Sequence, residues 1–269
     1  MWSPKSQTLR VGLSTQHLML VKAEGIWSRT PASCARIECE PAAQAEPWRP
    51  VVKALAGVLA AQSPTKITLH IVLSGRFVRW QLLPWRAGLT QASELTAYAS
   101  LRFREIFGKA AEDWQMLYAP QPPGTTMPAC AIDVALMDAL RSTCETAGVR
   151  LASVTPYFSS AFDQWRRSLG GGAAWFGLIE SDCISLGLLQ GGRWAGLHTQ
   201  RLDGDWRRIL PGMMAQMGIA AGLTESSPPL YLAGSEEAPQ PTGDLPFMWL
   251  KPKLRFGQSL VGQRLALGV

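Results

Sequence analysis

Side chains that could do chemistry are thinly spread through this sequence. The five cysteines include no Cys-x-x-Cys pair, so they predict neither a zinc site nor a disulfide framework. No Walker A phosphate loop and no Gly-x-Ser-x-Gly nucleophile elbow occurs. His17, His70 and His198 stand far apart and are typical of packed or surface histidines. The residues alone therefore indicate no catalytic centre and no metal site.

One acidic cluster needs a separate interpretation. Asp203-Gly204-Asp205 has the spacing that begins a calcium loop, but the remaining ligands and the closing bidentate Glu are missing. An Asp immediately before an apolar-periodic segment is also a common helix N-cap. We interpret the cluster as the start of a helix.

Composition and charge narrow the classes of partner. The 269 residues are 47% hydrophobic and 17% charged, enough for a sizeable core in one large domain or two lobes. The net charge of +6 favours an acidic partner, such as an anionic membrane surface or an acidic protein. Because basic residues are not interleaved with aromatic ones in runs, nucleic acid is not expected. No apolar run reaches the ~18 residues that span a bilayer, and no signal-peptide pattern follows the N-terminus, so we expect a chain that is not exported.

The central stretch, residues 67–107, sets the positions of the other elements. A β-rich run at Ile67–Leu73 turns at Ser74-Gly75 and continues through Phe77 to Leu83, where Pro84 stops the strand. The apolar period then changes to steps of three and four, which predicts a helix over 91–107 with Thr90 as its N-cap. This unit is structural and carries no catalytic residue.

The remaining pattern falls into two halves separated by the glycines of Ser168–Gly172, a predicted hinge. In the first half we expect a hairpin of Leu9–Leu13 and His17–Val21, a strand at Ala35–Cys39, a helix at Val51–Ala61, strands at Trp114–Tyr118 and Cys130–Val134, a helix capped by Asp133, a strand at Leu151–Val154 and a helix with Pro156 at its first position. In the second half we expect strands at Ala174–Ile179, Ile184–Leu189, Arg193–Leu202 and Leu230–Ala233, and a helix at Asp205–Ala221 that Pro211 kinks or delays.

The second half echoes the first. Gly12-Leu13, a polar turn, an apolar strand and then Trp27 are matched in spacing by Gly177-Leu178, a polar turn, an apolar strand and then Trp194. Spacing of this kind predicts an internal structural repeat.

Two halves that each begin with a hairpin, a third strand and a helix resemble the actin-like, ribonuclease H-like fold. Within it, the chain resembles the cytoplasmic actin-like (ASKHA) assembly proteins of bacterial envelope machines: PilM of type IV pili and the cytoplasmic domain of GspL in type II secretion. Those proteins share a strand ending in Leu-Pro, a helix, a strand, and a helix ending in Ala-Gly before a strand and a Pro. The matching residues here are Leu83-Pro84, the 91–107 helix, Ala147-Gly148 and Pro156.

The resemblance implies an α/β fold of two lobes, each a mixed β-sheet flanked by helices. The first lobe would span residues 1–168, with an inserted subdomain at about 75–134, and the second lobe residues 173–269. It leaves open whether the machine served is a pilus or a secretion system. A GspL-type chain would continue past Val269 into a transmembrane helix.

The resemblance also identifies candidate nucleotide loops. Actin-like ATPases resemble one another at two hairpin turns, each with an Asp beside a Gly, that hold phosphate and Mg²⁺. Here the first turn carries Ser14 and Thr15 and no carboxylate, while the second carries Glu180 and Asp182 without an adjacent Gly. The adenosine-side Gly-Gly motif is reduced to Gly234. We therefore expect degenerate loops, no hydrolysis and no required cofactor, with residual ATP binding left open.

The function that the resemblance implies is a non-catalytic scaffold, cytoplasmic and peripheral to the inner membrane. Its expected partners are the cytoplasmic tail of a bitopic inner-membrane protein, other platform proteins including a secretion ATPase, and, as an option, a second copy of the chain. The tail would add to a strand edge of the inserted subdomain. The candidate partner-binding residues are Arg79, Trp80, Arg102, Arg104 and Trp114, although Trp80 is equally explained as core. The alternative function is a nucleotide-binding actin-like ATPase or kinase.

Overall fold

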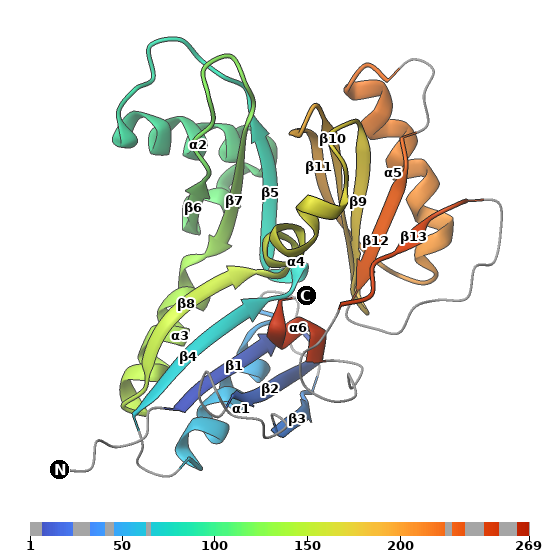
Figure 1. Cartoon of the computed structure of the whole chain (residues 1–269). Coiled ribbons are helices and arrows are strands. Elements are labelled where there is room, and N and C mark those ends of the chain that lie inside the picture. Colours follow the sequence, from blue (N-terminus) through green and yellow to red (C-terminus); the bar gives the residue numbers. More distant parts are fainter. Residues whose placement is uncertain are drawn as a thin grey trace.

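The computed structural model describes residues 7–23, 33–40, 46–62, 66–223, 228–234, 245–252 and 263–268. These residues form two five-stranded sheets and one three-stranded sheet, with helices on their faces (Figure 1). Trp27, which belongs to the predicted repeat, lies outside the described residues.

The first sheet has the strand order β3-β2-β1-β4-β8. Its strands are β1 (Gln7–Leu13), β2 (His17–Ala23), β3 (Ser33–Glu38), β4 (Ile67–Leu73) and β8 (Arg150–Pro156). The first three are joined antiparallel, and β1, β4 and β8 run parallel. Alternate residues such as Leu9, Val11, Leu69 and Ile71 are fully buried in the core cluster that includes residues of α1 (Arg49–Ala60) and α3 (Val134–Thr146).

The second sheet repeats this order as β11-β10-β9-β12-β13. Its strands are β9 (Ala174–Ile179), β10 (Cys183–Gln190), β11 (Arg193–Arg201), β12 (Leu230–Gly234) and β13 (Met248–Trp249). Every residue of β9 is buried because both faces of this strand are covered, which is why its sequence does not alternate. The shared strand order confirms the predicted internal repeat.

A third sheet, β5-β7-β6, stands apart from the other two and follows β4 in the chain. It consists of β5 (Val78–Leu83), β6 (Trp114–Tyr118) and β7 (Met127–Asp133), with α2 (Ala92–Phe107) packed against it through Ala99 and Phe103. All three strands are antiparallel. We call β5, α2, β6 and β7 the inserted subdomain.

Several predicted element boundaries are wrong by one or a few residues. The N-cap of α2 is Gln91, not Thr90, because Gln91 and Glu94 form a reciprocal capping box. The strand expected from Phe77 begins at Val78, since Gly75–Phe77 form a 3₁₀ turn. Pro156 is the N-cap of α4 (Tyr157–Trp165), where its backbone is extended, rather than the first helical residue.

Pro211 does not delay its helix as expected. The helix α5 runs over Trp206–Ala220 with Pro211 inside it, and Asp205 is its N-cap, accepting a hydrogen bond from the backbone N–H of Arg207. The burial of Leu210 and Met213 against the second sheet compensates for the hydrogen bond that proline cannot make. The Asp203–Asp205 cluster is thus a helix start, as predicted.

The two lobes are joined by more than the chain connection. The short helix α6 (Gln263–Leu267) packs on β1, β2 and β4 of the first sheet, although residues 173–269 were expected to belong to the second lobe. Leu265 shares a buried cluster with Phe176 and Leu178 of the second sheet. Figure 1 shows α6 between the tips of the two sheets.

Candidate functional site

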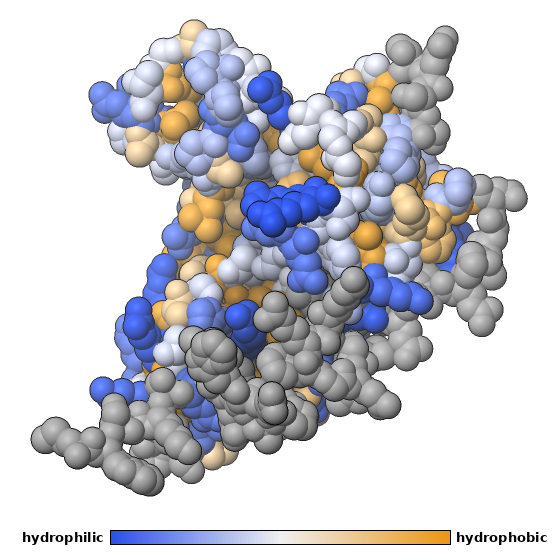
Figure 2. All heavy atoms as spheres, in the orientation of Figure 1, coloured by the Kyte–Doolittle hydropathy of each residue, from blue (hydrophilic) through white to orange (hydrophobic). Residues whose placement is uncertain are grey.

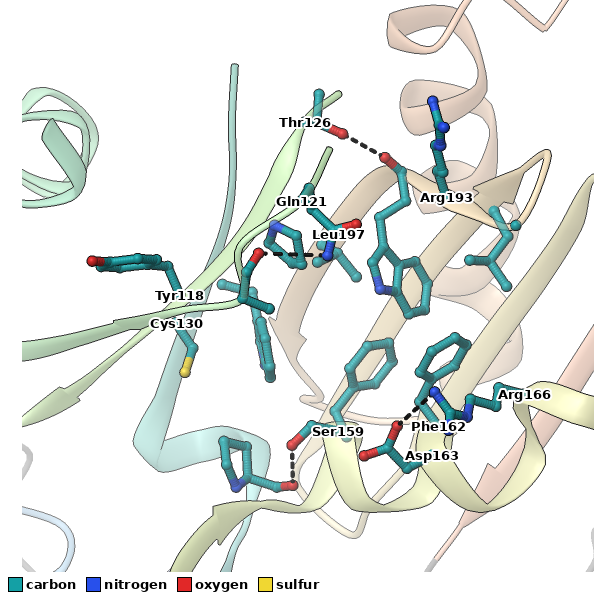
Figure 3. Close-up of a pocket in the computed structure, with 18 of the residues that line it drawn as sticks. Tyr118, Gln121, Thr126, Cys130, Ser159, Phe162, Asp163, Arg166, Arg193 and Leu197 are labelled. Atoms are coloured by element: carbon teal, nitrogen blue, oxygen red, sulfur yellow. Dashed lines mark hydrogen bonds and ion pairs between the residues drawn. The ribbon is translucent and has the colours of Figure 1, made fainter. Parts of the chain in front are cut away.

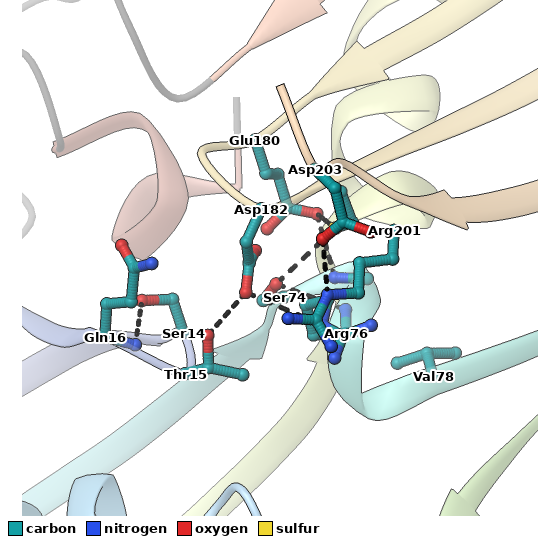
Figure 4. Close-up of polar contacts among 12 residues, drawn as sticks. Ser14, Thr15, Gln16, Ser74, Arg76, Val78, Glu180, Asp182, Arg201 and Asp203 are labelled. Atoms are coloured by element: carbon teal, nitrogen blue, oxygen red, sulfur yellow. Dashed lines mark hydrogen bonds and ion pairs between the residues drawn. The ribbon is translucent and has the colours of Figure 1, made fainter. Parts of the chain in front are cut away.

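The two hairpin turns predicted as nucleotide loops are in direct contact with each other between the lobes. Thr15, in the β1–β2 turn, donates a hydrogen bond from its hydroxyl to the Asp182 carboxylate in the β9–β10 turn (Figure 4). The Nε of Arg76 lies 3.6 Å from the same carboxylate oxygen. Asp182 is thereby held by a hydroxyl and a guanidinium from the first lobe.

Glu180 makes a second contact between the lobes. Its Oε1 accepts a hydrogen bond from the backbone N–H of Gly75 at 2.8 Å, and the Cys183 thiol donates to the same oxygen at 3.3 Å. The carboxyl is only 4% exposed, and burial raises its pKa to about 7. A Cβ at position 75 would lie 3.0 Å from Glu180 Oε1, so the absence of a side chain at Gly75 permits this approach.

Ser14 closes its own turn. Its Oγ accepts the backbone N–H groups of Gln16 (3.3 Å) and His17 (3.0 Å), donates to the His17 carbonyl, and lies 3.0 Å from His17 Nδ1. Burial lowers the pKa of His17, so its neutral ring is favoured in this position. The first turn thus supplies hydroxyl groups that are already hydrogen-bonded and no carboxylate.

Gly234, at the end of β12, faces protein on two sides. A Cβ there would be 2.7 Å from the carbonyl oxygen of Ile179, and the Gly234 carbonyl accepts a hydrogen bond from Arg264 of α6 at 3.2 Å. The structure therefore brings Thr15, Asp182 and Glu180 together, while Gly234 lies against α6.

This set of residues does not fit a magnesium–nucleotide complex. Asp182 already accepts from Thr15 and lies near Arg76, the first turn adds no acid to share a metal, and Glu180 is buried against Gly75. Among the described residues, no group of three His, Cys, Asp or Glu side chains could hold a metal ion. The arrangement connects the two lobes through these side chains.

The five predicted partner-binding residues do not converge on one surface. Arg79 donates to the carbonyl oxygens of Arg76 and Val78 and lies 5.9 Å from the ring centroid of Trp114. Trp80 packs instead against Phe158 of α4, with ring centroids 5.7 Å apart.

The two arginines of α2 lie on the exposed side of the inserted subdomain. Arg102 pairs with Glu105 one turn along the helix, while Arg104 lines a shallow hollow together with Trp114. Arg79, Arg104 and Trp114 are therefore neighbours, and Arg102 and Trp80 lie elsewhere.

A hollow with a volume of about 770 Å³ lies between the inserted subdomain, α4 and the β10–β11 turn. We call it the interlobe groove; Figure 2 shows the surface hollowed there, and Figure 3 shows its lining. It is lined by Trp80, Leu117, Tyr118, Phe158, Phe162, Trp194 and Leu197, with Arg166, Arg167 and Arg193 among its charged residues. One end is bridged by a hydrogen bond from the Thr126 hydroxyl to the Trp194 carbonyl at 2.8 Å.

Sequence reasoning missed this groove, apart from Trp80. The available signal was the juxtaposition of aromatic and basic residues in two places, Trp165-Arg166-Arg167 and Arg193-Trp194. Neither segment indicates a groove by itself, because the two segments come together only when the two lobes pack.

Two sheets of matching strand order, in contact through their hairpin turns, give the chain a two-lobed architecture. Among solved structures, the chain is similar to a protein of unknown function with an actin-like ATPase fold from Bacteroides thetaiotaomicron, with a TM-score of 0.59 and 13% identity over 88% of this chain and 84% of that one.

It is also similar to the cytoplasmic domain of EpsL, an inner membrane component of the type II secretion system of Vibrio cholerae, with a TM-score of 0.60 and 12% identity over 98% of this chain and 93% of that one. A third similar structure is from a PilM–PilN type IV pilus biogenesis complex, with a TM-score of 0.54 and 13% identity over 86% and 82% of the two chains. No protein-family model and no curated protein matches the chain. The chain has the actin-like fold, which confirms the predicted fold class.

Proposed function

We propose that this protein is a non-catalytic scaffold of a bacterial inner-membrane assembly platform of the type II secretion or type IV pilus kind. The likeness to the EpsL cytoplasmic domain and to the PilM–PilN complex supports the kind of machine. Because one fold serves many activities, the choice between a scaffold and an enzyme depends on the residues of the two hairpin turns.

The observation that carries the proposal is the direct contact between the two hairpin turns. Thr15 donates to Asp182, and Gly75 donates to Glu180, so groups that would face a phosphate chain face each other instead. An ATPase or kinase would need an acid in the first turn to position the metal and the attacking group. Ser14 and Thr15 stand there.

The partners follow from this role as further proposals. They are the cytoplasmic tail of a bitopic inner-membrane protein, which we place on the inserted subdomain, other platform proteins including a secretion ATPase, and a second copy of the chain. The protein would lie in the cytoplasm, peripheral to the inner membrane, with recovery in the membrane fraction that depends on the partner. Among the described helices, none is long and apolar enough to cross a bilayer.

The experiment that tests the scaffold role is a phosphate-release assay with purified protein, ATP and Mg²⁺. We expect no turnover above the no-enzyme background, since no first-turn acid is available. An Asp182→Asn variant serves as the control for contaminating ATPases, because contamination would be unaffected by it. Turnover by the wild-type protein that Asp182→Asn abolishes would contradict the proposal.

A further inference from the structure

The interlobe groove carries an excess of positive charge. Arg166 lies 4.0 Å from Asp163, one turn earlier in the chain. Arg167 and Arg193 are exposed and form no ion pair with any residue that the structure describes. The charged residues that line the groove are Arg166, Arg167, Arg193 and Asp163, so its lining carries three guanidinium groups and one carboxylate.

The floor of the groove is aromatic. The ring of Phe162 lies 4.4 Å from the ring of Trp194, and Phe158 lies 5.7 Å from both Trp194 and Trp80, centroid to centroid. Three elements from different parts of the chain thus supply one continuous apolar surface. Rigid aromatic side chains of this kind bind apolar groups at a low cost in conformational entropy.

The end of strand β6 reaches the groove. In the sheet order β5-β7-β6, β6 is an edge strand, and its last residues Leu117 and Tyr118 line the groove. Leu117 is 47% exposed, so an apolar side chain is accessible at this end of the groove. An extended chain lying along the groove can place alternate side chains against these residues.

We propose that the interlobe groove binds an extended acidic segment of a partner protein, with apolar side chains on Phe162 and Trp194 and carboxylates at Arg167 and Arg193. This inference rests on the proposed function and specifies the chemistry of the tail that the scaffold takes. The volume of about 770 Å³ lies within the range of binding pockets and accommodates a few side chains rather than a folded domain. The aromatic floor is recessed between three elements, so a flat anionic bilayer cannot reach it as a side chain can.

The test uses a phage-displayed library of random twelve-residue peptides, selected on the immobilised full-length protein. We expect the selected peptides to be enriched in Asp and Glu interleaved with Leu, Phe or Trp. Synthetic versions are then measured by fluorescence anisotropy at low and high salt, where affinity is expected to fall as salt rises.

Two variants locate the site. The double variant Arg167→Glu and Arg193→Glu is expected to weaken binding about tenfold or more, because each change replaces attraction by repulsion. The matched control is Arg208→Glu, an exposed arginine of α5 that does not line the groove. All of these positions are exposed, so the melting temperatures are expected to be unchanged.

Three results would overturn the inference. Failure to select any peptide is the first, and selected peptides that lack acidic residues are the second. The third is equal affinity of the double variant and the wild-type protein, which would place a tail-binding site elsewhere and leave the scaffold role standing. Binding to phosphatidylserine vesicles that the double variant abolishes, without peptide binding, would assign the groove to lipid instead. The phosphate-release assay tests the scaffold role independently.

Discussion

At the residue scale, Glu180 connects buried charge to stability. Its carboxyl faces Gly75 and Ser74 of the first lobe and Asp182 and Cys183 of its own turn, and Tyr157 lies within electrostatic range. Burial is the main cause of its raised pKa, and Asp182 adds to it, while the hydrogen bonds to the carboxylate oppose it. The folded protein therefore binds a proton here more tightly than the unfolded chain.

We predict that the protein becomes less stable as pH rises through about 7, because Glu180 then loses this proton. The stabilisation is fully present below the unfolded pKa of 4.5 and is lost as pH passes the folded value of about 7. The difference corresponds to roughly 3 kcal/mol of unfolding free energy. In Glu180→Gln, whose amide oxygen can still accept from Gly75, this part of the pH dependence should vanish.

The measurement is urea unfolding at pH 5, 6, 7 and 8 for both proteins. Subtracting the variant's curve removes contributions shared with it, such as that of His17, whose lowered pKa acts in the opposite direction. Parallel curves for the two proteins would show that Glu180 does not titrate in this range.

At the element scale, α6 depends on a glycine in the strand beneath it. A Cβ at Gly12 would lie 2.6 Å from Leu265 Cγ and 2.7 Å from the Ala266 backbone nitrogen. The backbone of α6 cannot yield to it as a flexible side chain could. The packing of α6 on β1 therefore requires a glycine at position 12. In the sequence, Gly12 indicated only the internal repeat.

We predict that Gly12→Ala destabilises the protein by about 1–3 kcal/mol, because it forces α6 away from β1. Gly57→Ala is the matched control: this glycine is exposed within α1, nothing lies within 4 Å of an added Cβ, and the change should stabilise by up to ~1 kcal/mol. Chemical unfolding of the two variants measures both effects. An unchanged stability for Gly12→Ala would mean that α6 does not pack there in solution.

Comparison of sequence and structure shows which elements local patterns determine. Apolar periodicity located the 91–107 helix and the β9–β11 meander. Burial of one face of a helix, or of both faces of a strand, determines the spacing of apolar residues in the sequence. The predicted N-cap of α2 was one residue too early, because the capping box between Gln91 and Glu94 determines where this helix begins. The groove was missed because Phe162 and Trp194, 32 positions apart by their numbers, meet only through tertiary packing.

At the scale of the whole molecule, the two lobes are held together at their hairpin turns. The Thr15–Asp182 and Gly75–Glu180 contacts cross between the lobes, Arg76 adds charge to the first of them, and α6 bridges both sheets. A ligand that binds between these turns would have to break these contacts first. The energy of breaking them subtracts directly from its affinity.

The most direct test of this account is a calorimetric titration of the purified protein with ATP in the presence and absence of Mg²⁺. We predict no saturable magnesium-dependent heat for the wild-type protein or for Thr15→Ala, because removing the Thr15–Asp182 hydrogen bond does not restore the missing acid. A saturable binding isotherm that requires Mg²⁺ and disappears in Asp182→Asn would contradict it.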